Sequence, residues 1–253
     1  MRLTLHLLLI SGLALSAHAA DVCNPRDVQG TYGFQIAGET AISGASQPAV
    51  SLGRLIFDAD GGVSGTSSVK FAGLLLGNPV TGTYESHADC SVTWSLQDDS
   101  GGFQHFRGVA APGGGRVRFR QADPGGMRDG LMVRTAADGC KAADIQQKYA
   151  FKLSGATIPM TEGGAAQTVS AEGVMEQDAN HHFHLTLEGK PPYTTDVSID
   201  VESDCTVEQE TVLPFAGNAT AVKLRGILVD HGKQILAIQT DPGAMVSVRF
   251  TAP

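Results

Sequence analysis

The feature that most constrains the fold of this chain is an internal duplication. The segment from Cys23 to Phe34 matches the segment from Cys140 to Phe151, at an offset of 117 residues. Three further motif pairs keep the same order at offsets of 115 to 118 residues: Asp89-Cys90 with Asp204-Cys205, Phe106-Arg107-Gly108 with Leu224-Arg225-Gly226, and Asp123-Pro124-Gly125 with Asp241-Pro242-Gly243. Four pairs of different sequence motifs that recur in the same order predict two tandem domains of ordinary size. We place them at residues 20–136 and 137–253.

Within each copy, apolar residues recur with a period of two, which is typical of β-strands with one buried face. The clearest runs are Tyr32 to Ile36, Val92 to Leu96 and Phe183 to Leu187. Turn signals such as Asp60-Gly61 separate the runs. We expect an all-β protein of two antiparallel β-barrel-like, calycin-like domains, because closure leaves no exposed edge strand. Two β-sandwiches are the alternative, since the patterning does not separate the two architectures.

The first residues have the three parts of an export signal. Arg2 precedes an apolar run from Leu3 to Leu15, and the small-x-small sequence Ala17-His18-Ala19 follows. We therefore predict a signal peptide at residues 1–19 and a periplasmic or extracellular location. The apolar run is shorter than the roughly 20 residues that cross a bilayer, and we predict no membrane span.

The charge balance excludes one class of partner. Acidic residues number 26 against 18 Lys and Arg, for a net charge of −8. Proteins that bind nucleic acid instead gather Lys and Arg against the phosphates. We therefore expect no nucleic-acid partner.

The four cysteines fall two in each copy, at Cys23 and Cys90, then at Cys140 and Cys205. An even number of cysteines in an exported chain favours disulfides. The symmetric pairing joins Cys23 to Cys90 and Cys140 to Cys205, giving each copy the same covalent link. A swapped set, in which Cys90 pairs with Cys140, is the alternative.

The first copy carries a recognisable series of motifs. These are Gly30-Thr-Tyr-Gly-Phe34, then Phe57-Asp-Ala-Asp-Gly-Gly-Val-Ser-Gly65, Gly82-Thr-Tyr84 and Asp89-Cys90. The series resembles a widespread group of uncharacterised secreted bacterial β-proteins, and the domains are similar to allene-oxide-cyclase-like and lipocalin-like barrels. The resemblance implies a fold and carries no function by itself. The second copy departs from the pattern between Glu176 and His182, where the Phe-Asp-x-x-Gly-Gly turn is replaced.

Two sets of side chains are candidates for ligand contact. Aromatic residues of the expected strands either line a lumen or fill it as core. Arg107 and Arg225 occupy matching positions, so they either face a ligand or serve the fold of both copies. The ligand-binding candidates are Tyr32, Phe34, Trp94, Arg107, Tyr149, Phe151 and Arg225.

A histidine cluster in the second copy is the candidate for metal binding. His182 and His184 stand two residues apart on an expected strand, so both point to one face. Two imidazoles in that arrangement can bind zinc or copper, although the sequence identifies no third ligand. An exposed polar face beside a hairpin turn is the alternative.

These features favour an exported two-domain protein that binds a small apolar ligand. A structural or surface protein-interaction module is one alternative, and its protein partner is unknown. An isomerase or cyclase of the allene-oxide-cyclase type is the other. We assign no catalytic residue and no cofactor, because the chain lacks the sequence motifs of nucleophile elbows, phosphate-binding loops and zinc helices.

Overall fold

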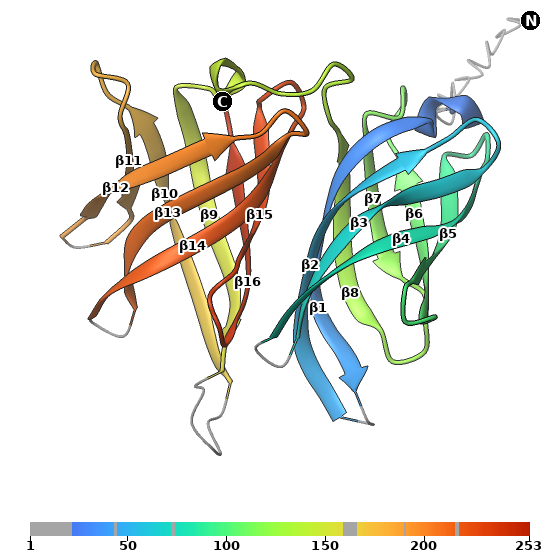
Figure 1. Ribbon diagram of the computed structural model, residues 1–253, viewed down its shortest axis with the longest axis horizontal. Coiled ribbons are helices and arrows are strands. Elements are labelled where there is room, and N and C mark those ends of the chain that lie inside the picture. The colour runs from blue at the N-terminus through green and yellow to red at the C-terminus, as the bar shows by residue number, and fades with distance from the viewer. Residues whose placement is uncertain (1–21, 43–44, 72–73, 159–165, 190, 216–217) are drawn as a thin grey trace, which may run out of the picture.

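The computed structural model describes residues 22–42, 45–71, 74–158, 166–189, 191–215 and 218–253. The predicted signal peptide lies outside these residues. The chain forms two closed antiparallel barrels of eight strands each (Figure 1). The first barrel contains β1 (Gly30–Ile42), β2 (Ala45–Phe57), β3 (Gly62–Phe71), β4 (Leu74–Ser86), β5 (Ser91–Asp98), β6 (Phe103–Ala110), β7 (Arg116–Gln121) and β8 (Met127–Arg134). The second contains β9 (Lys148–Thr157), β10 (Gln167–Gln177), β11 (Phe183–Leu187), β12 (Tyr193–Val201), β13 (Thr206–Phe215), β14 (Asn218–Val229), β15 (Gln234–Gln239) and β16 (Ala244–Thr251).

Closure confirms the barrel prediction and excludes the sandwich alternative. Strand β1 pairs with β2 on one side and with β8 on the other, and β9 pairs in the same way with β10 and β16. Because side chains alternate along each strand, Tyr32, Phe34 and Ile36 enter the first lumen, where each is at most 4% exposed. Gly33 and Gln35 point outward from the same strand.

A short helix and a disulfide begin each barrel. The 3-10 helices η1 (Pro25–Val28) and η2 (Ala142–Asp144) precede β1 and β9, and they are the helices of the described chain. Neither has the length or hydropathy to cross a membrane. The cysteines pair symmetrically, as Cys23–Cys90 and Cys140–Cys205.

The same tyrosine anchors both copies at the end of the barrel where the short helix lies. The Tyr32 hydroxyl donates to the Gly114 carbonyl at 2.6 Å, and the Tyr149 hydroxyl donates to the Gly232 carbonyl at 2.6 Å. Burial raises the pKa of Tyr149 to about 12, so this hydroxyl remains a donor over the whole neutral range. The matching tyrosines are therefore buried structural groups of each lumen.

The barrels pack side by side through an apolar interface. Strand β15 is buried at every residue, because one face enters the lumen and the other meets the first barrel. The outward residues Leu52 and Val133 of the first barrel belong to one buried cluster with Val229 and Leu236 of the second. A Cβ at Gly33 would lie 2.7 Å from Val229 Cγ1, so glycine permits this close approach. The matching outward residues of β7 are Arg116, Arg118 and Arg120, and the latter two are exposed.

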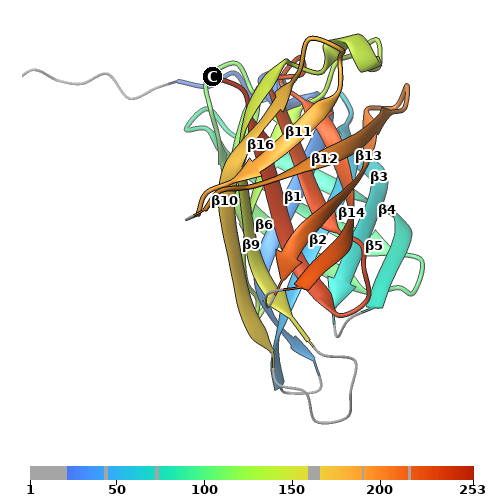
Figure 2. The same ribbon diagram turned by 90° about the vertical axis from the view of Figure 1, so that its left-hand side faces the viewer.

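Buried polar contacts complete the interface. Gln35 donates from Nε2 to the carbonyls of Ala237 at 2.6 Å and Val248 at 2.9 Å, and its Oε1 accepts from Arg249 Nε at 2.8 Å. Lys70 donates from Nζ to the carbonyls of Gln239 and Asp241. Strands β10 to β12 lie on the side of the second barrel that faces away from the first, as both views show (Figures 1 and 2).

Replacing Gln35 tests the importance of this polar contact. We expect Gln35→Ala to lower the free energy of unfolding by roughly 1–3 kcal/mol, because the carbonyls of the buried residues Ala237 and Val248 lose their side-chain donor. Urea unfolding followed by circular dichroism measures the change. Gln167→Ala, at an exposed position of β10, is the control and should change stability by less than about 0.5 kcal/mol. Equal effects of the two substitutions would contradict the argument.

Candidate functional site

The lumen of the first barrel is filled by aromatic side chains at the end where η1 lies. The Phe57 ring is central: its centroid lies 5.6 Å from that of Tyr32, 5.0 Å from that of Tyr84 and 6.1 Å from that of Trp94. Trp94 in turn lies 4.9 Å from Phe119. These edge-to-face contacts form a packed core.

The strand registers identify the equivalent residues of the second barrel. Trp94 lies opposite Tyr84 in the ladder between β4 and β5, and Gln209 lies opposite Ile199 in the ladder between β12 and β13. Phe57 lies two residues after Leu55, which faces Tyr32, and Gln177 lies two residues after Met175, which faces Tyr149. The aromatic layer Tyr32, Phe57, Tyr84 and Trp94 thus becomes Tyr149, Gln177, Ile199 and Gln209. Phe119 becomes Ala237 in the same way.

A pocket of about 570 Å³ opens at this layer of the second barrel. The lumen-facing residues of β12 that line it, Val197, Ile199 and Val201, are only half-buried. Ala142 of η2 and the adjacent Ile145 line one side of the pocket. The remaining lining comes from the end of β10, the turn after it, the start of β11, and β12: Gln177, His181, His182, Phe183, His184, Asp196 and Ser198. Its volume falls in the range of small-molecule sites, and its wall is partly apolar.

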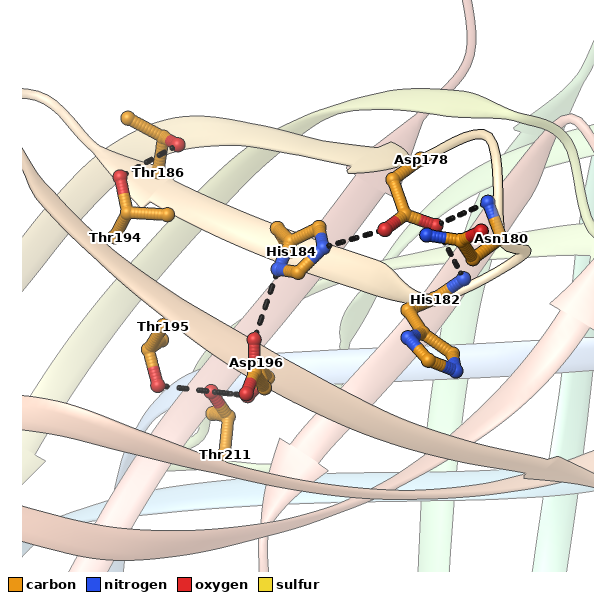
Figure 3. A network of polar contacts seen from close by, with 9 residues as sticks. All are labelled: Asp178, Asn180, His182, His184, Thr186, Thr194, Thr195, Asp196 and Thr211. Atoms are coloured by element: carbon orange, nitrogen blue, oxygen red, sulfur yellow. Dashed lines mark hydrogen bonds and ion pairs between the residues drawn. The ribbon is translucent and has the colours of Figure 1, made fainter.

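His184 links two carboxylates at the rim of the pocket (Figure 3). Its Nδ1 lies 2.8 Å from Asp196 Oδ1, and its Nε2 lies 3.4 Å from Asp178 Oδ2. Asp178 also accepts at Oδ1 from the backbone N–H groups of Asn180 and His182, at 2.8 and 2.9 Å. The rim of the pocket is therefore a hydrogen-bonded bridge across β10, β11 and β12.

The bridge shifts the pKa of both kinds of group. The hydrogen bond from the His182 N–H is the largest cause that lowers the pKa of Asp178, to about 2. The hydrogen bond to Asp178 is the largest cause that raises the pKa of His184 above its usual value of 6.5, and Asp196 adds to it. The arrangement therefore favours an imidazolium between two carboxylates.

Metal binding by His182 and His184 remains a prediction. Both ring nitrogens of His184 face carboxylate oxygens, and His182 is exposed beside them. Across the described ranges, no group of three or more His, Cys, Asp or Glu residues is arranged to hold a metal ion.

The structure separates the predicted ligand-binding residues into two sets. The aromatic residues Tyr32, Phe34, Trp94, Tyr149 and Phe151 face the lumens and are at most 4% exposed. Arg107 and Arg225 are exposed on the outer faces, so they do not line a lumen. Arg225 pairs through Nε with Glu208 Oε1 at 3.1 Å and borders a groove of about 340 Å³ between the barrels.

The sequence prediction missed two buried glutamines of the second lumen, of which Gln209 takes the place of Trp94 and Gln239 that of Gln121. Gln209 and Gln239 are 2% and 5% exposed. Among the described residues, Nε2 and Oε1 of Gln209 both lack a hydrogen-bond partner. Oε1 of Gln239 also lacks one among these residues. Alignment of Asp89-Cys90 with Asp204-Cys205 places Gln209 on Trp94, so comparing the two copies residue by residue would have found it.

Comparison with the first barrel explains why Oε1 of Gln239 has no hydrogen-bond donor within the described chain. There Gln121 Oε1 accepts from Arg128 Nε at 2.8 Å, inside the lumen. Gln239 keeps the other half of that arrangement, donating from Nε2 to Asp241 Oδ2 at 2.9 Å as Gln121 does to Asp123 at 3.0 Å. Val246 takes the place of Arg128, which removes the donor.

Comparisons with known proteins leave the site without a functional parallel. No family model and no curated protein sequence matches the chain. A solved structure of a protein of unknown function from the DUF3598 family of Nostoc punctiforme is similar at 13% identity, with a TM-score of 0.26, over 89% of this chain and 95% of that one. A porin-like protein from Bacteroides uniformis is similar at 10% identity, with a TM-score of 0.21, over 93% of this chain and 100% of that one. Neither likeness carries an argument, and the resemblance to allene-oxide-cyclase-like barrels stays a prediction.

The pKa of His184 is open to direct measurement. We expect its ring to titrate above pH 6.5 in the folded protein and Asp178→Asn to lower that pKa, because the largest cause of the shift is removed. The bridge then contributes its full stabilisation below pH 6.5 and loses it as the pH rises through the raised pKa. Nuclear magnetic resonance of the ring signals provides the measurement, with Asp129→Asn on the first barrel as the control. A wild-type pKa of 6.5 or less would exclude the bridge.

The cost of the unpartnered carboxamide can be measured as well. We expect Gln209→Met, which keeps the length of the side chain and removes its polar atoms, to raise the free energy of unfolding by roughly 1–3 kcal/mol. Chemical denaturation measures the difference. The same change at Gln121, whose carboxamide is hydrogen-bonded at both atoms, is the matched control and should destabilise. A stability loss in Gln209→Met would show that its carboxamide has partners.

Proposed function

We propose that this chain is an exported binding protein and that its second barrel holds a small, largely apolar molecule in the pocket beside η2. The observation that carries the proposal is the contrast between the two lumens. The same layer is closed by packed aromatic rings in the first barrel, whereas in the second it contains Gln177, Ile199 and Gln209 beside a pocket of about 570 Å³. Small barrels with an open lumen are suited to one small ligand.

The chemistry of the lumen favours binding over catalysis. The buried polar groups of the second lumen, within the described residues, are the amides of Gln209 and Gln239 and the hydroxyls of Tyr149 and Thr211. These groups do not exchange protons near neutral pH, whereas an isomerase or cyclase needs a general acid or base. The histidines of the pocket lie at its rim, where His184 is already paired with Asp178 and Asp196. The buried amides and hydroxyls can orient a ligand through hydrogen bonds, which supports a binding role.

Two features support export. The signal-like segment at residues 1–19 has the composition of a secretory leader. Each barrel also carries a disulfide, and disulfides persist in oxidising compartments such as the periplasm and the extracellular space.

Filling the pocket with the residues of the first barrel tests the proposal. We expect the wild-type protein to bind the neutral dye Nile red, and the double variant Gln177→Phe/Gln209→Trp to bind it at least about tenfold more weakly, because the variant recreates the Phe57 and Trp94 rings of the packed lumen. Fluorescence titration measures the affinity.

Thr186→Trp is the matched control, since it adds an indole to the outer face of the same barrel at an exposed position. It should leave dye binding unchanged. The single variant Gln177→Phe and the thermal melting curves separate a filled pocket from a misfolded barrel. Absence of dye binding by the wild-type protein, or equal loss in Thr186→Trp, would refute the proposal.

A further inference from the structure

The second lumen contains a polar group that its own fold leaves without a partner. The Gln209 side chain is 2% exposed, and both Nε2 and Oε1 lack a hydrogen-bond partner among the described residues. Burying such a group without a partner opposes folding, and native structures seldom retain one without a reason. The position does not require glutamine, because the equivalent residue of the first barrel is Trp94. Glutamine at this position is accounted for when its carboxamide pairs with a molecule that the barrel binds.

The register places Gln209 next to a residue that lines the proposed pocket, although Gln209 itself is buried behind that lining. Gln209 lies directly opposite Ile199 across the ladder between β12 and β13, and Ile199 lines the pocket. Cross-strand neighbours of this kind have Cβ atoms about 4.5–5.5 Å apart and project to the same face of the sheet. A molecule resting on Ile199 is therefore one cross-strand spacing from the Gln209 side chain, and its head would meet the carboxamide by entering deeper into the lumen.

A second free acceptor lies in the same row of the lumen. Leu224 of β14 lies opposite Gln209 of β13 on one side and opposite Gln239 of β15 on the other. The Oε1 of Gln239 is the acceptor left without a donor by the exchange of Arg128 for Val246. Gln209 and Gln239 thus offer one free N–H donor group and two free carbonyl acceptors on either side of Leu224.

The charge of the lumen decides which polar group fits. The buried cations of the described chain, Lys70 and Arg128, both belong to the first barrel. The charged groups at the rim are already paired, His184 with Asp178 and Asp196. A carboxylate or an ammonium group entering the lumen beyond them would lose its hydration without gaining a buried counter-ion, which is strongly unfavourable. A neutral group that donates and accepts at once avoids this cost and satisfies both atoms of the carboxamide.

We infer that the second barrel recognises an amphipathic molecule with an apolar body and a neutral amide-type head, and that Gln209 pairs with the head by one donated and one accepted hydrogen bond. This inference rests on the proposed function, because it names the class of ligand for the same pocket. The apolar body lies on Val197, Ile199 and Val201, and the head lies at Gln209.

Three competitors of equal chain length test the inference. Nonanamide, methyl octyl ketone and nonanoate share one alkyl chain and differ only in the head: a neutral amide, an acceptor of the same shape, and an anion. Each is titrated against Nile red bound to the intact protein. We expect nonanamide to compete best at neutral pH and nonanoate to compete least.

The decisive readout is how Gln209→Met changes the ratio of nonanamide to ketone affinity. We expect this ratio to fall by about tenfold, which corresponds to one net hydrogen bond, while Nile red still binds. Gln177→Met is the matched control, because Gln177 lines the same pocket but already donates to the His181 carbonyl at 3.3 Å. It should leave the ratio unchanged.

The outcomes separate the two proposals. Wild-type protein that fails to bind Nile red refutes the proposed function itself. Wild-type protein that binds the dye but shows the same amide-to-ketone ratio as Gln209→Met refutes the inference alone. An equal fall in Gln177→Met also overturns the assignment to Gln209, and the best competition by nonanoate overturns the neutral head.

Discussion

Closure of each eight-stranded sheet on itself is the constraint on which the rest of this structure depends. Once β1 pairs with both β2 and β8, every second side chain of the barrel enters one enclosed lumen. A lumen of this size is filled by side chains or left open by them, so a few residues in one layer decide between a core and a binding site. In the second barrel Gln209 takes the place of Trp94 and Gln177 takes the place of Phe57, and both exchanges fall in that layer.

The two copies have kept the elements that build the barrel and changed those that fill it. Tyr32 and Tyr149 make the same hydrogen bond to a glycine carbonyl, and each copy has one disulfide in the same place. Inside, aromatic packing and a hydrogen-bonded Arg128 in the first barrel give way to amides with unpartnered atoms in the second. The duplication therefore separates the two roles: one barrel is a packed domain, and its copy carries the candidate site.

The position of the pocket follows from the way the barrels pack. Strand β15 is buried on both faces, because its outward residues Leu236 and Ile238 meet the first barrel. Strands β10 to β12 lie on the opposite side, where the lumen-facing residues of β12 are half-buried. The His184 bridge to Asp178 and Asp196 ties these three strands together at the rim of the pocket.

Much of the fold could be predicted from local patterns. The repeat of the Cys23 to Phe34 segment and the two-residue periodicity were sufficient for two antiparallel all-β domains, because each depends on neighbours within one strand or on a fixed offset. The choice of barrels over sandwiches was decided by the pairing of β1 with β8 and of β9 with β16. The same alternation placed Tyr32 and Trp94 on a buried face. The outward positions of Arg107 and Arg225 were not decided, since a matching position in both copies is compatible with either face.

The candidate site depended on tertiary structure. Gln177, Ile199 and Gln209 come from three different strands, and their position in one layer of the lumen requires the register of the ladders, which local periodicity does not specify. Whether an outward strand face meets water or a second barrel, as β7 and β15 do respectively, is equally a property of packing. The sequence by itself determined which residues alternate and where strands turn. Only the closed and packed barrels decided which of these residues share a cavity, because contacts between distant strands arise from closure and register together.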